Sequence, residues 1–158
     1  MDSLQVDITY LKNHIEQVPL LASWMFKTWG HYNPTSSLEK AEQKLLQHLN
    51  IDTLPLAYIA LHNEVPVGMC SLRVNDGIQH ALTPWLGSLY VEPLMRGRGI
   101  GEQLINTAAE KALNLGYSKL YLFAFDKTLP QWYEKLGWLE RGVDEINRYP
   151  VTVMELSL

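Results

Sequence analysis

Six residues with three glycines, Arg96–Gly101 (RGRGIG), separate an apolar run from an amphipathic stretch, and this arrangement restricts the fold most. The apolar run, Trp85–Val91, predicts a strand, and the amphipathic stretch predicts a helix from Glu102 to Leu115. Glycine has no Cβ, so a glycine-rich turn can approach a ligand closely. The free amides and the positive dipole end of a helix favour an anion such as a pyrophosphate. The sequence therefore predicts a strand–turn–helix unit that binds a phosphorylated ligand.

The rest of the chain predicts a sheet that is mixed in direction. The apolar run Leu120–Phe125 follows the helix and is typical of a buried strand parallel to the one before it. Asn63 and Glu64 join two further strands in an antiparallel hairpin. Ser36, three residues before Glu39, predicts a capping box at a helix start. The remaining expected elements are strands at Gln5–Tyr10, Leu56–His62, Val67–Val74, Trp138–Arg141 and Val151–Leu158, and helices from Leu11 to about Trp29 with a break at Pro19, from Ser36 to about Leu49, and at Leu129–Leu136.

These elements predict the fold class. We expect one α/β (α+β) domain over residues 1–158, with a mixed, mostly antiparallel sheet, a central parallel strand pair and flanking helices. No internal repeat or low-complexity segment argues for a second unit.

Composition and charge limit the classes of partner. The formal net charge is −4, which argues against a general nucleic-acid binder because such proteins need a basic surface. No basic segment precedes an apolar core at the N-terminus, and no apolar run reaches the ~18 residues of a membrane span. We therefore expect a cytoplasmic protein. The single cysteine, Cys70, argues against a disulfide framework or a multi-cysteine metal site, and its apolar neighbours predict burial.

The glycine turn alone fits more than one ligand. A dinucleotide-binding turn expects G-x-G-x-x-G in the first strand–helix unit, whereas this turn lies two-thirds of the way along the chain. A Walker-type loop needs Gly-Lys-Ser/Thr, which the turn lacks. A purely structural turn without a ligand stays open at this point.

Three segments together resemble one family. Leu89-Tyr90-Val91-Glu92-Pro93 followed by Arg96-x-x-Gly99-x-Gly101 is similar to the coenzyme A signature of the GNAT N-acetyltransferase superfamily. Gly116–Leu122 resembles the fifth strand of that family, and Trp132–Trp138 resembles its F-Y-x-K-x-G-F segment. The resemblance covers about residues 55–141.

The resemblance implies an acyl-CoA N-acyltransferase fold and an activity. The enzyme would transfer the acetyl group of acetyl-CoA to a primary amine by direct transfer in a ternary complex, without a metal. The acceptor would be a small molecule or a peptide N-terminus, and a homodimer is left open. The alternative is a non-catalytic acyl-CoA sensor or interaction module, and a nucleotide-binding regulator is a further one.

The resemblance also implies the residues of the donor site. The backbone of Leu89, Tyr90 and Val91 would bind the pantetheine arm, and the Val91 N–H would stabilise the oxyanion. The pyrophosphate would bind the amides of the turn, with charge added by Arg96 and Arg98 unless these are merely solvated. The implied pyrophosphate-binding residues are Gly97, Arg98, Gly99, Ile100, Gly101 and Glu102.

Two further residues follow from the same resemblance. Tyr133 matches the frequent general acid, which donates to the departing thiolate, although a role in packing beside Trp132 and Trp138 stays open. Asp126 replaces a frequent asparagine that places the cofactor, and it could instead attract the acceptor ammonium.

The general base and the acceptor are less defined. Two positions that often hold a glutamate fall on Trp85 and Tyr121, so the base candidates are a water relay, Asp126, Asp76 and His80, and an amine with a lowered pKa would need none. The aromatic segment between the first two helices suits a cationic or apolar acceptor. We expect Trp29 and Tyr32 near the acceptor, and Trp24 in the core.

Overall fold

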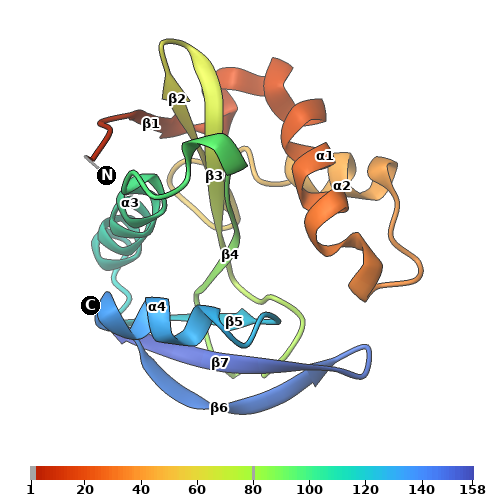
Figure 1. Ribbon diagram of the computed structural model, residues 1–158, viewed down its shortest axis with the longest axis vertical. Helices are drawn as coiled ribbons and strands as arrows, with labels where there is room; N and C mark the ends of the chain where they lie inside the picture. Colours follow the sequence, from red (N-terminus) through yellow and green to blue (C-terminus); the bar gives the residue numbers. More distant parts are fainter. Residues whose placement is uncertain (1–2, 80) are drawn as a thin grey trace.

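The computed structural model describes residues 3–79 and 81–158, which form a seven-stranded mixed sheet with helices on both faces (Figure 1). The strands are β1 (Asp7–Tyr10), β2 (Leu56–His62), β3 (Val65–Arg73), β4 (Trp85–Val91), β5 (Lys119–Ala124), β6 (Leu139–Ile146) and β7 (Tyr149–Ser157). The α-helices are α1 (Val18–Trp29), α2 (Leu38–Leu46), α3 (Ile100–Asn114) and α4 (Leu129–Lys135). Short 3-10 helices are η1 (Leu11–Gln17), η2 (Gly30–Tyr32) and η3 (Pro93–Met95).

The sheet order is β1-β2-β3-β4-β5-β7-β6. β4 and β5 run parallel, and the other neighbouring strands are antiparallel. The expected mixed sheet with a central parallel pair is therefore confirmed. No helix in the described part of the chain combines the length and apolarity that a membrane crossing needs.

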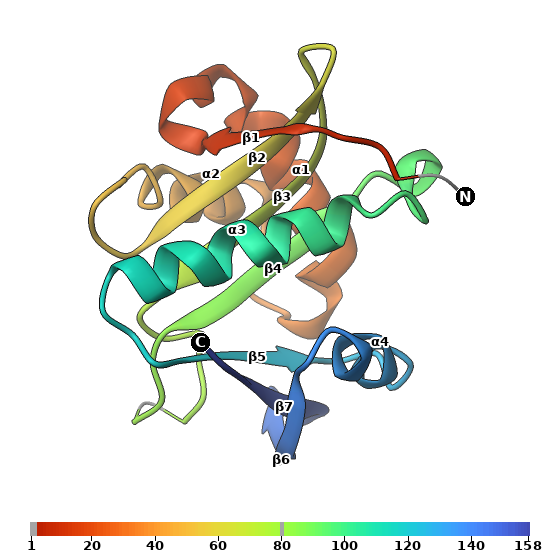
Figure 2. The same cartoon turned by 90° about the vertical axis from the view of Figure 1, so that its left-hand side faces the viewer.

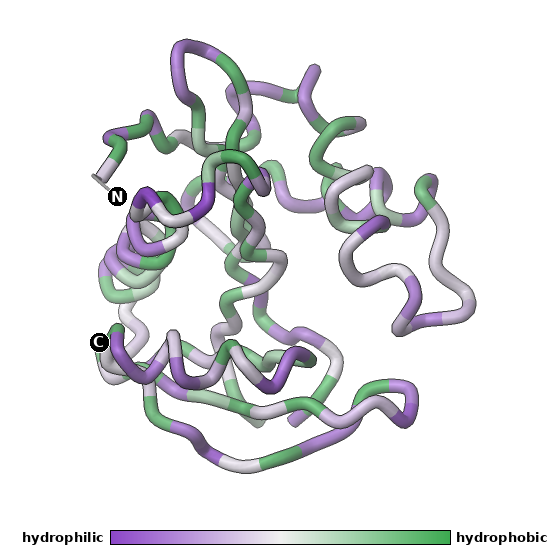
Figure 3. The backbone as a smooth tube through the Cα atoms, viewed as in Figure 1, coloured by the Kyte–Doolittle hydropathy of each residue, from purple (hydrophilic) through white to green (hydrophobic). Residues whose placement is uncertain are grey.

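Helices cover both faces of the central strands β2, β3 and β4. α3 lies on one face, and α1 and α2 lie on the other (Figure 2). Successive residues of a strand point to opposite faces, so Tyr58 packs in the cluster that contains Leu104 of α3, whereas Ile59 packs in the cluster that contains Leu21 of α1. Both sets of side chains are buried, which explains why β2 is apolar without alternation. In Figure 3 the tip of the β2–β3 hairpin is hydrophilic, whereas hydrophobic residues recur where these strands pass between the helices.

The helix boundaries differ from the sequence prediction at two places. α1 begins at Val18, because Pro19 fits a first turn and the preceding stretch forms the 3-10 helix η1. The predicted capping box at Ser36 is wrong. The side chain of Ser37 caps α2 by accepting the Lys40 N–H at 3.1 Å, while the Ser36 hydroxyl donates to the Gly30 carbonyl at 2.7 Å.

α2 and β6 also differ in length from the prediction. α2 ends at Leu46, and Leu49 instead forms a single antiparallel bridge with Leu56. β6 continues to Ile146, past the predicted end at Arg141, and it pairs with β7 along its length. Its side chains are mostly exposed, so an apolar pattern could not reveal this edge strand.

β4 and β5 pair at one point and then separate. Trp85 is aligned with Tyr121, and the Tyr121 N–H donates to the Pro84 carbonyl at 3.0 Å. Beyond this point β5 pairs with β7 on its other side, while the register between β3 and β4 shifts after Met69. The shift coincides with a positive φ of 50° at Ser88. The C-terminal half of β4 therefore diverges from β5 and leaves a gap in the centre of the sheet.

Candidate active site

A cavity of about 1250 Å³ extends through the gap between β4 and β5. On one side of the sheet it is bounded by the glycine turn and α4, and on the other by α1, η2 and α2. The cavity therefore connects the two faces of the sheet. The lining residues that the sequence predicts for the site are Trp29, Tyr32, Asp76, Leu89, Tyr90, Val91, Arg96, Gly97, Gly99, Ile100, Gly101, Glu102, Asp126 and Tyr133.

The glycine turn presents free backbone amides to this cavity. Gly97 and Gly99 have φ of 80° and 82°, a left-handed conformation that favours glycine. The Gln103 N–H donates to the Gly99 carbonyl at 3.1 Å, so the amides of residues 100–102 lie before the first intrahelical bond of α3. A Cβ at Gly97 would meet no atom within 4 Å, so the turn is open there. These features fit an anionic group such as a pyrophosphate.

The two arginines of the turn differ in position. Arg96 turns back toward the sheet: its Nε donates to the Val91 carbonyl at 2.8 Å, and its guanidinium lies 5.5 Å from the centre of the Tyr90 ring. Arg98 is not among the described residues that line the cavity. Its backbone carbonyl accepts a hydrogen bond from the Leu4 N–H at 2.9 Å. The side chain of Arg96 thus supports β4.

The backbone of β4 directs one amide into the gap. The Glu92 N–H donates to the Val67 carbonyl of β3 at 2.9 Å. In an antiparallel strand, neighbouring residues direct their N–H and C=O groups to opposite sides. The N–H and C=O of Val91 therefore point away from β3, toward the space where β5 has separated. A hydrogen-bond donor at this position can stabilise a negative charge that develops on a bound carbonyl oxygen.

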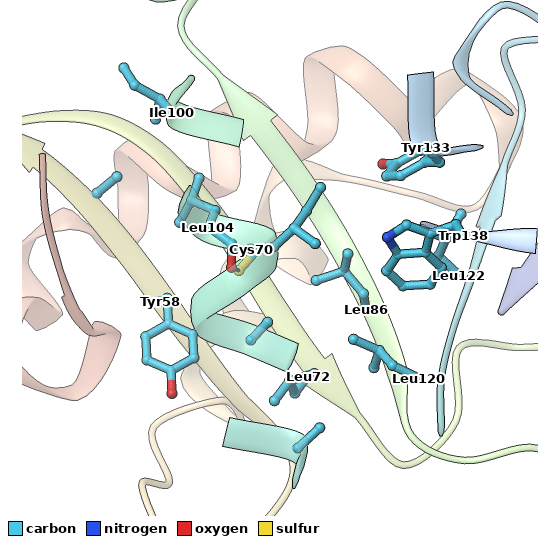
Figure 4. Close-up of a cluster of buried hydrophobic side chains, with 14 of the residues drawn as sticks. Tyr58, Cys70, Leu72, Leu86, Ile100, Leu104, Leu120, Leu122, Tyr133 and Trp138 are labelled. Carbon is cyan, nitrogen blue, oxygen red and sulfur yellow. Dashed lines mark hydrogen bonds between the residues drawn. The ribbon is translucent and has the colours of Figure 1, made fainter. Parts of the chain in front are cut away.

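Tyr133 lies on α4 with its ring buried and its hydroxyl at the cavity. The residue is 6 % exposed, and its ring lies 5.0 Å from that of Trp132 and 5.8 Å from that of Trp138. Figure 4 shows the hydroxyl turned away from Trp138, toward the sheet. Within the described residues this hydroxyl has no hydrogen-bond partner. Burial raises the pKa of Tyr133 well above the ordinary value, so the phenol stays protonated and can donate.

The structure places the predicted base candidates in unfavourable settings. Asp126 is exposed at the end of β5 and accepts hydrogen bonds from the amide and the hydroxyl of Thr128, at 2.8 and 2.7 Å, which lower its pKa. The carboxylate of Asp76 forms an ion pair with Arg73 at 2.7 Å. His80 lies outside the described residues. Both described carboxylates are thus already engaged, Asp126 in hydrogen bonds and Asp76 in an ion pair.

Aromatic residues close the opposite end of the cavity. Tyr32 stacks on Phe125 with ring centroids 3.6 Å apart, and it meets Tyr149 edge-on at 4.9 Å. Trp29 also lines the cavity, whereas Trp24 is buried and stacks on Tyr90 at 4.9 Å. The predictions that Trp24 is in the core and that Cys70 is buried are confirmed.

A polar cluster that the sequence did not predict lies beside this aromatic end. Arg73 of β3 is 6 % exposed, and it contacts Asp76, Ser88 and His48. Lys44 of α2 lies next to Arg73, close enough that the two positive charges interact. Two sequence features could have indicated this cluster. They are an arginine at the end of an apolar strand and a lysine on a short amphipathic helix. The described residues contain no group of three or more side chains arranged to hold a metal ion.

Comparison with known proteins identifies the family. The sequence model of the Acetyltransferase (GNAT) family matches residues 19–138. The chain belongs to the GNAT acetyltransferase family. The sequence resemblance to GNAT proteins is therefore confirmed. No curated protein matches this GNAT sequence significantly.

Solved structures share its fold. An aminoglycoside 6'-acetyltransferase type Ii is 25% identical, with 96% of each chain covered and a TM-score of 0.72. An aminoglycoside 6'-N-acetyltransferase complexed with coenzyme A is 21% identical over 96% of each chain, with a TM-score of 0.72. The PaiA N-acetyltransferase from Thermoplasma acidophilum, in complex with coenzyme A, is 20% identical, with 98% of this chain and 100% of that chain covered and a TM-score of 0.73.

Proposed function

We propose that this GNAT protein transfers the acetyl group of acetyl-CoA to a primary amine by direct attack in a ternary complex. The observation that carries the proposal is the cavity that joins the open glycine turn to the aromatic wall through the gap between β4 and β5. A donor that enters at the turn and an acceptor that enters from α1 and α2 can meet in this gap. No covalent intermediate on the enzyme is needed for such a transfer.

The donor would lie along the turn and the end of β4. The amides of Gly97–Glu102 would hold the pyrophosphate, and the backbone of Leu89–Val91 would hold the pantetheine arm. The Val91 N–H would then face the thioester oxygen. Loss of one such donor typically costs ~3–4 kcal/mol of transition-state stabilisation. Asp126 lines the same cavity and would contact the donor or the acceptor ammonium.

The chemistry consists of one substitution at the thioester carbon. The amine nitrogen attacks this carbon and forms the C–N bond, and the tetrahedral intermediate then breaks the C–S bond. Tyr133 donates to the leaving sulfur. A phenol is a weaker acid than a thiol, so Tyr133 stabilises the thiolate chiefly through a hydrogen bond. The amine proton leaves to water, since Asp76 is ion-paired and the pKa of Asp126 is lowered.

Cys70 offers no covalent alternative. The residue is fully buried on β3, and its thiol donates to the Leu104 carbonyl of α3 with a separation of 3.7 Å. Burial raises the pKa of the thiol to about 12, and the thiolate is the nucleophilic form. A buried thiol that stays protonated supports direct transfer over transfer through an acylated cysteine.

A two-step experiment separates the enzyme from a non-catalytic sensor of the same fold. Calorimetry first measures binding of acetyl-CoA, and an assay of thiol release then screens amines, including amino acids, peptide N-termini and aminoglycosides. The proposal expects both binding and amine-dependent release. Binding without release on any amine would favour the sensor, and preferential binding of NAD or ATP would favour a nucleotide regulator.

A further inference from the structure

Positive charge gathers at the acceptor end of the cavity. Lys40 and Lys44 of α2 and Arg73 of β3 line it, and Asp76 is the carboxylate beside them. Lys40 and Lys44 are four residues apart, so they lie on the same side of the helix. The other lining carboxylates are Glu102, in the first turn of α3, and Asp126, after β5. Three cations with one adjacent anion leave an excess of positive charge in a chain whose net charge is −4.

Arg73 is fixed in this cluster by hydrogen bonds. Its Nη1 contacts the Asp76 carboxylate at 2.7 Å, and its Nη2 donates to the Ser88 hydroxyl at 2.7 Å. A Cβ at Gly87 would lie 2.5 Å from Nη1, so the guanidinium packs directly against the backbone of β4. The arginine is thus held at the strand whose later residues face the reaction centre.

His48 is neutral, so it does not change the excess of positive charge in this cluster. Its Nδ1 lies 2.7 Å from the Lys44 carbonyl, to which it donates, and its Nε2 accepts from the Arg73 Nε at 3.0 Å. This arrangement fixes the neutral imidazole. Burial and the nearby Arg73 lower the pKa of His48 to about 3, in agreement with the hydrogen-bond pattern.

Lys44 is the cation without a partner. Among the residues that the structure describes, its ammonium has neither a hydrogen-bond acceptor nor an ion-pair partner. The positive charge of Arg73 and burial lower the pKa of Lys44 to about 8, and Asp76 offsets only part of this effect. The Lys44 side chain is exposed at the cavity, and a nearby negative charge would offset the repulsion between it and Arg73. A ligand anion at this place would supply that charge.

We propose that the acceptor amine also carries an anionic group, a carboxylate or a phosphate, which binds Lys44 beside Arg73 at the α2 end of the cavity. This inference rests on the proposed acetyl transfer. Lys40, whose ammonium now donates to the Thr35 carbonyl at 2.6 Å, lies one turn away and adds charge. The rings of Trp29 and Tyr32 line the same end and suit an apolar body between the two groups. Polycationic acceptors are disfavoured by this end of the cavity.

Binding to the protein saturated with coenzyme A tests the inference without turnover. Calorimetry at pH 8 compares leucine and phenylalanine with their carboxamides, and O-phosphoethanolamine with ethanolamine. We expect at least one anionic ligand to bind at least tenfold more tightly than its neutral-tailed partner, and the two arms distinguish carboxylate from phosphate. An anion raises the pKa of Lys44, so binding should also take up protons, detected as a dependence of the heat on the buffer.

A lysine pair provides the matched variants. Lys44→Met should remove the preference and the proton uptake, whereas Lys27→Met, at an exposed position of α1 outside the cavity, should retain both. Equal binding within each pair, tighter binding of the neutral-tailed ligands, no binding of any anionic ligand, or a preference that survives Lys44→Met overturns the inference.

Turnover separates this inference from the proposed function. Acetylation of the carboxamides in preference to the amino acids would overturn the proposal that the acceptor carries an anionic group. It would leave the proposed acetyl transfer intact. Selective binding of the anionic ligands without acetylation of any amine would overturn acetyl transfer and support the anion site.

Discussion

The ring of Tyr32 lies parallel to that of Phe125, with centroids 3.6 Å apart and planes inclined by 4°. Tyr32 belongs to η2, between the first two α-helices, and Phe125 follows β5. The Asn147 side-chain amide also donates to the Tyr32 carbonyl at 3.1 Å. These contacts hold the segment between α1 and α2 against the far side of the gap. The end of the cavity opposite the glycine turn is therefore closed by side chains from distant parts of the chain.

Loss of this stack should weaken acceptor binding. Tyr32→Ala is expected to raise the acceptor KM about tenfold and to leave the affinity for coenzyme A within about twofold, since an aromatic pair contributes ~0.5–1.5 kcal/mol beyond its buried area. Tyr32→Phe retains the stacked ring and serves as the control. Steady-state kinetics with a varied acceptor provides the measurement, and an unchanged KM in Tyr32→Ala would place this ring outside the acceptor wall.

A charged side chain in the glycine turn should abolish donor binding. Gly99→Glu introduces bulk and negative charge where the pyrophosphate would lie, at a φ of 82°. Gly116→Glu is the matched control, because Gly116 has a φ of 97° at the other end of α3. Each variant should lose roughly 1 kcal/mol of stability from the left-handed backbone. Calorimetry should show coenzyme A binding in Gly116→Glu alone, and binding in both variants would make the turn purely structural.

Removal of the Tyr133 hydroxyl should slow the chemistry. Tyr133→Phe keeps the buried ring between the two tryptophans, so we expect an unchanged affinity for coenzyme A. We expect a kcat at least about tenfold lower, because a hydrogen bond to a charged group contributes ~1.5–3 kcal/mol. Burial raises the pKa of Tyr133, so its ionisation should not limit the rate at pH 8–10. A pH profile of kcat for both proteins measures these effects. A variant as fast as the wild type would assign Tyr133 to packing.

Acid should destabilise the fold through His48. The pKa of His48 is lowered to about 3, whereas an unfolded histidine titrates near pH 6.5. Between these values the unfolded chain binds the proton and the folded chain does not, so stability falls as the pH falls, by at most about 1.4 kcal/mol per pH unit. His48→Gln keeps an acceptor for Arg73 and removes this titration.

Urea unfolding at pH 7 and pH 5 tests the role of His48. The loss of stability on acidification should be smaller in His48→Gln than in the wild type, and His62→Gln, at the end of β2, serves as a control. Equal losses in the wild type and His48→Gln would contradict a neutral buried imidazole. Lys44 acts in a separate window, because its lowered pKa reduces stability as the pH falls from about 10.5 to 8.

Local patterns predicted the parts of the site that are contiguous in sequence. The strand, the glycine turn and the helix from Trp85 to Asn114 were predicted nearly to their ends because periodicity and glycine act over a few residues. The three-residue spacing to Glu39 favours Ser36 as the cap, whereas the extended backbone of Ser37 brings its side chain to the Lys40 N–H.

Long-range contacts account for what the sequence could not predict. His48 contacts Arg73, 25 positions away, and Tyr32 of η2 stacks on Phe125, which follows β5. The sequence around each of these residues does not indicate which distant residue it contacts. Arg73 ends a strand that is buried from Val67 onward. Its partner Asp76 is only three residues away in the sequence, whereas Ser88 and His48 reach it only in the folded chain.

The central claim is that a donor at the glycine turn gives its acetyl group to an amine across the gap. Its most direct test is the mass-spectrometric detection of acetylated amine after incubation of acetyl-CoA and an amine panel with the wild-type protein and with Gly99→Glu in parallel. The account predicts an acetylated amine and stoichiometric free thiol with the wild type, and neither with Gly99→Glu. Equal acetylation by both proteins, or none by a wild-type protein that binds acetyl-CoA, would contradict it.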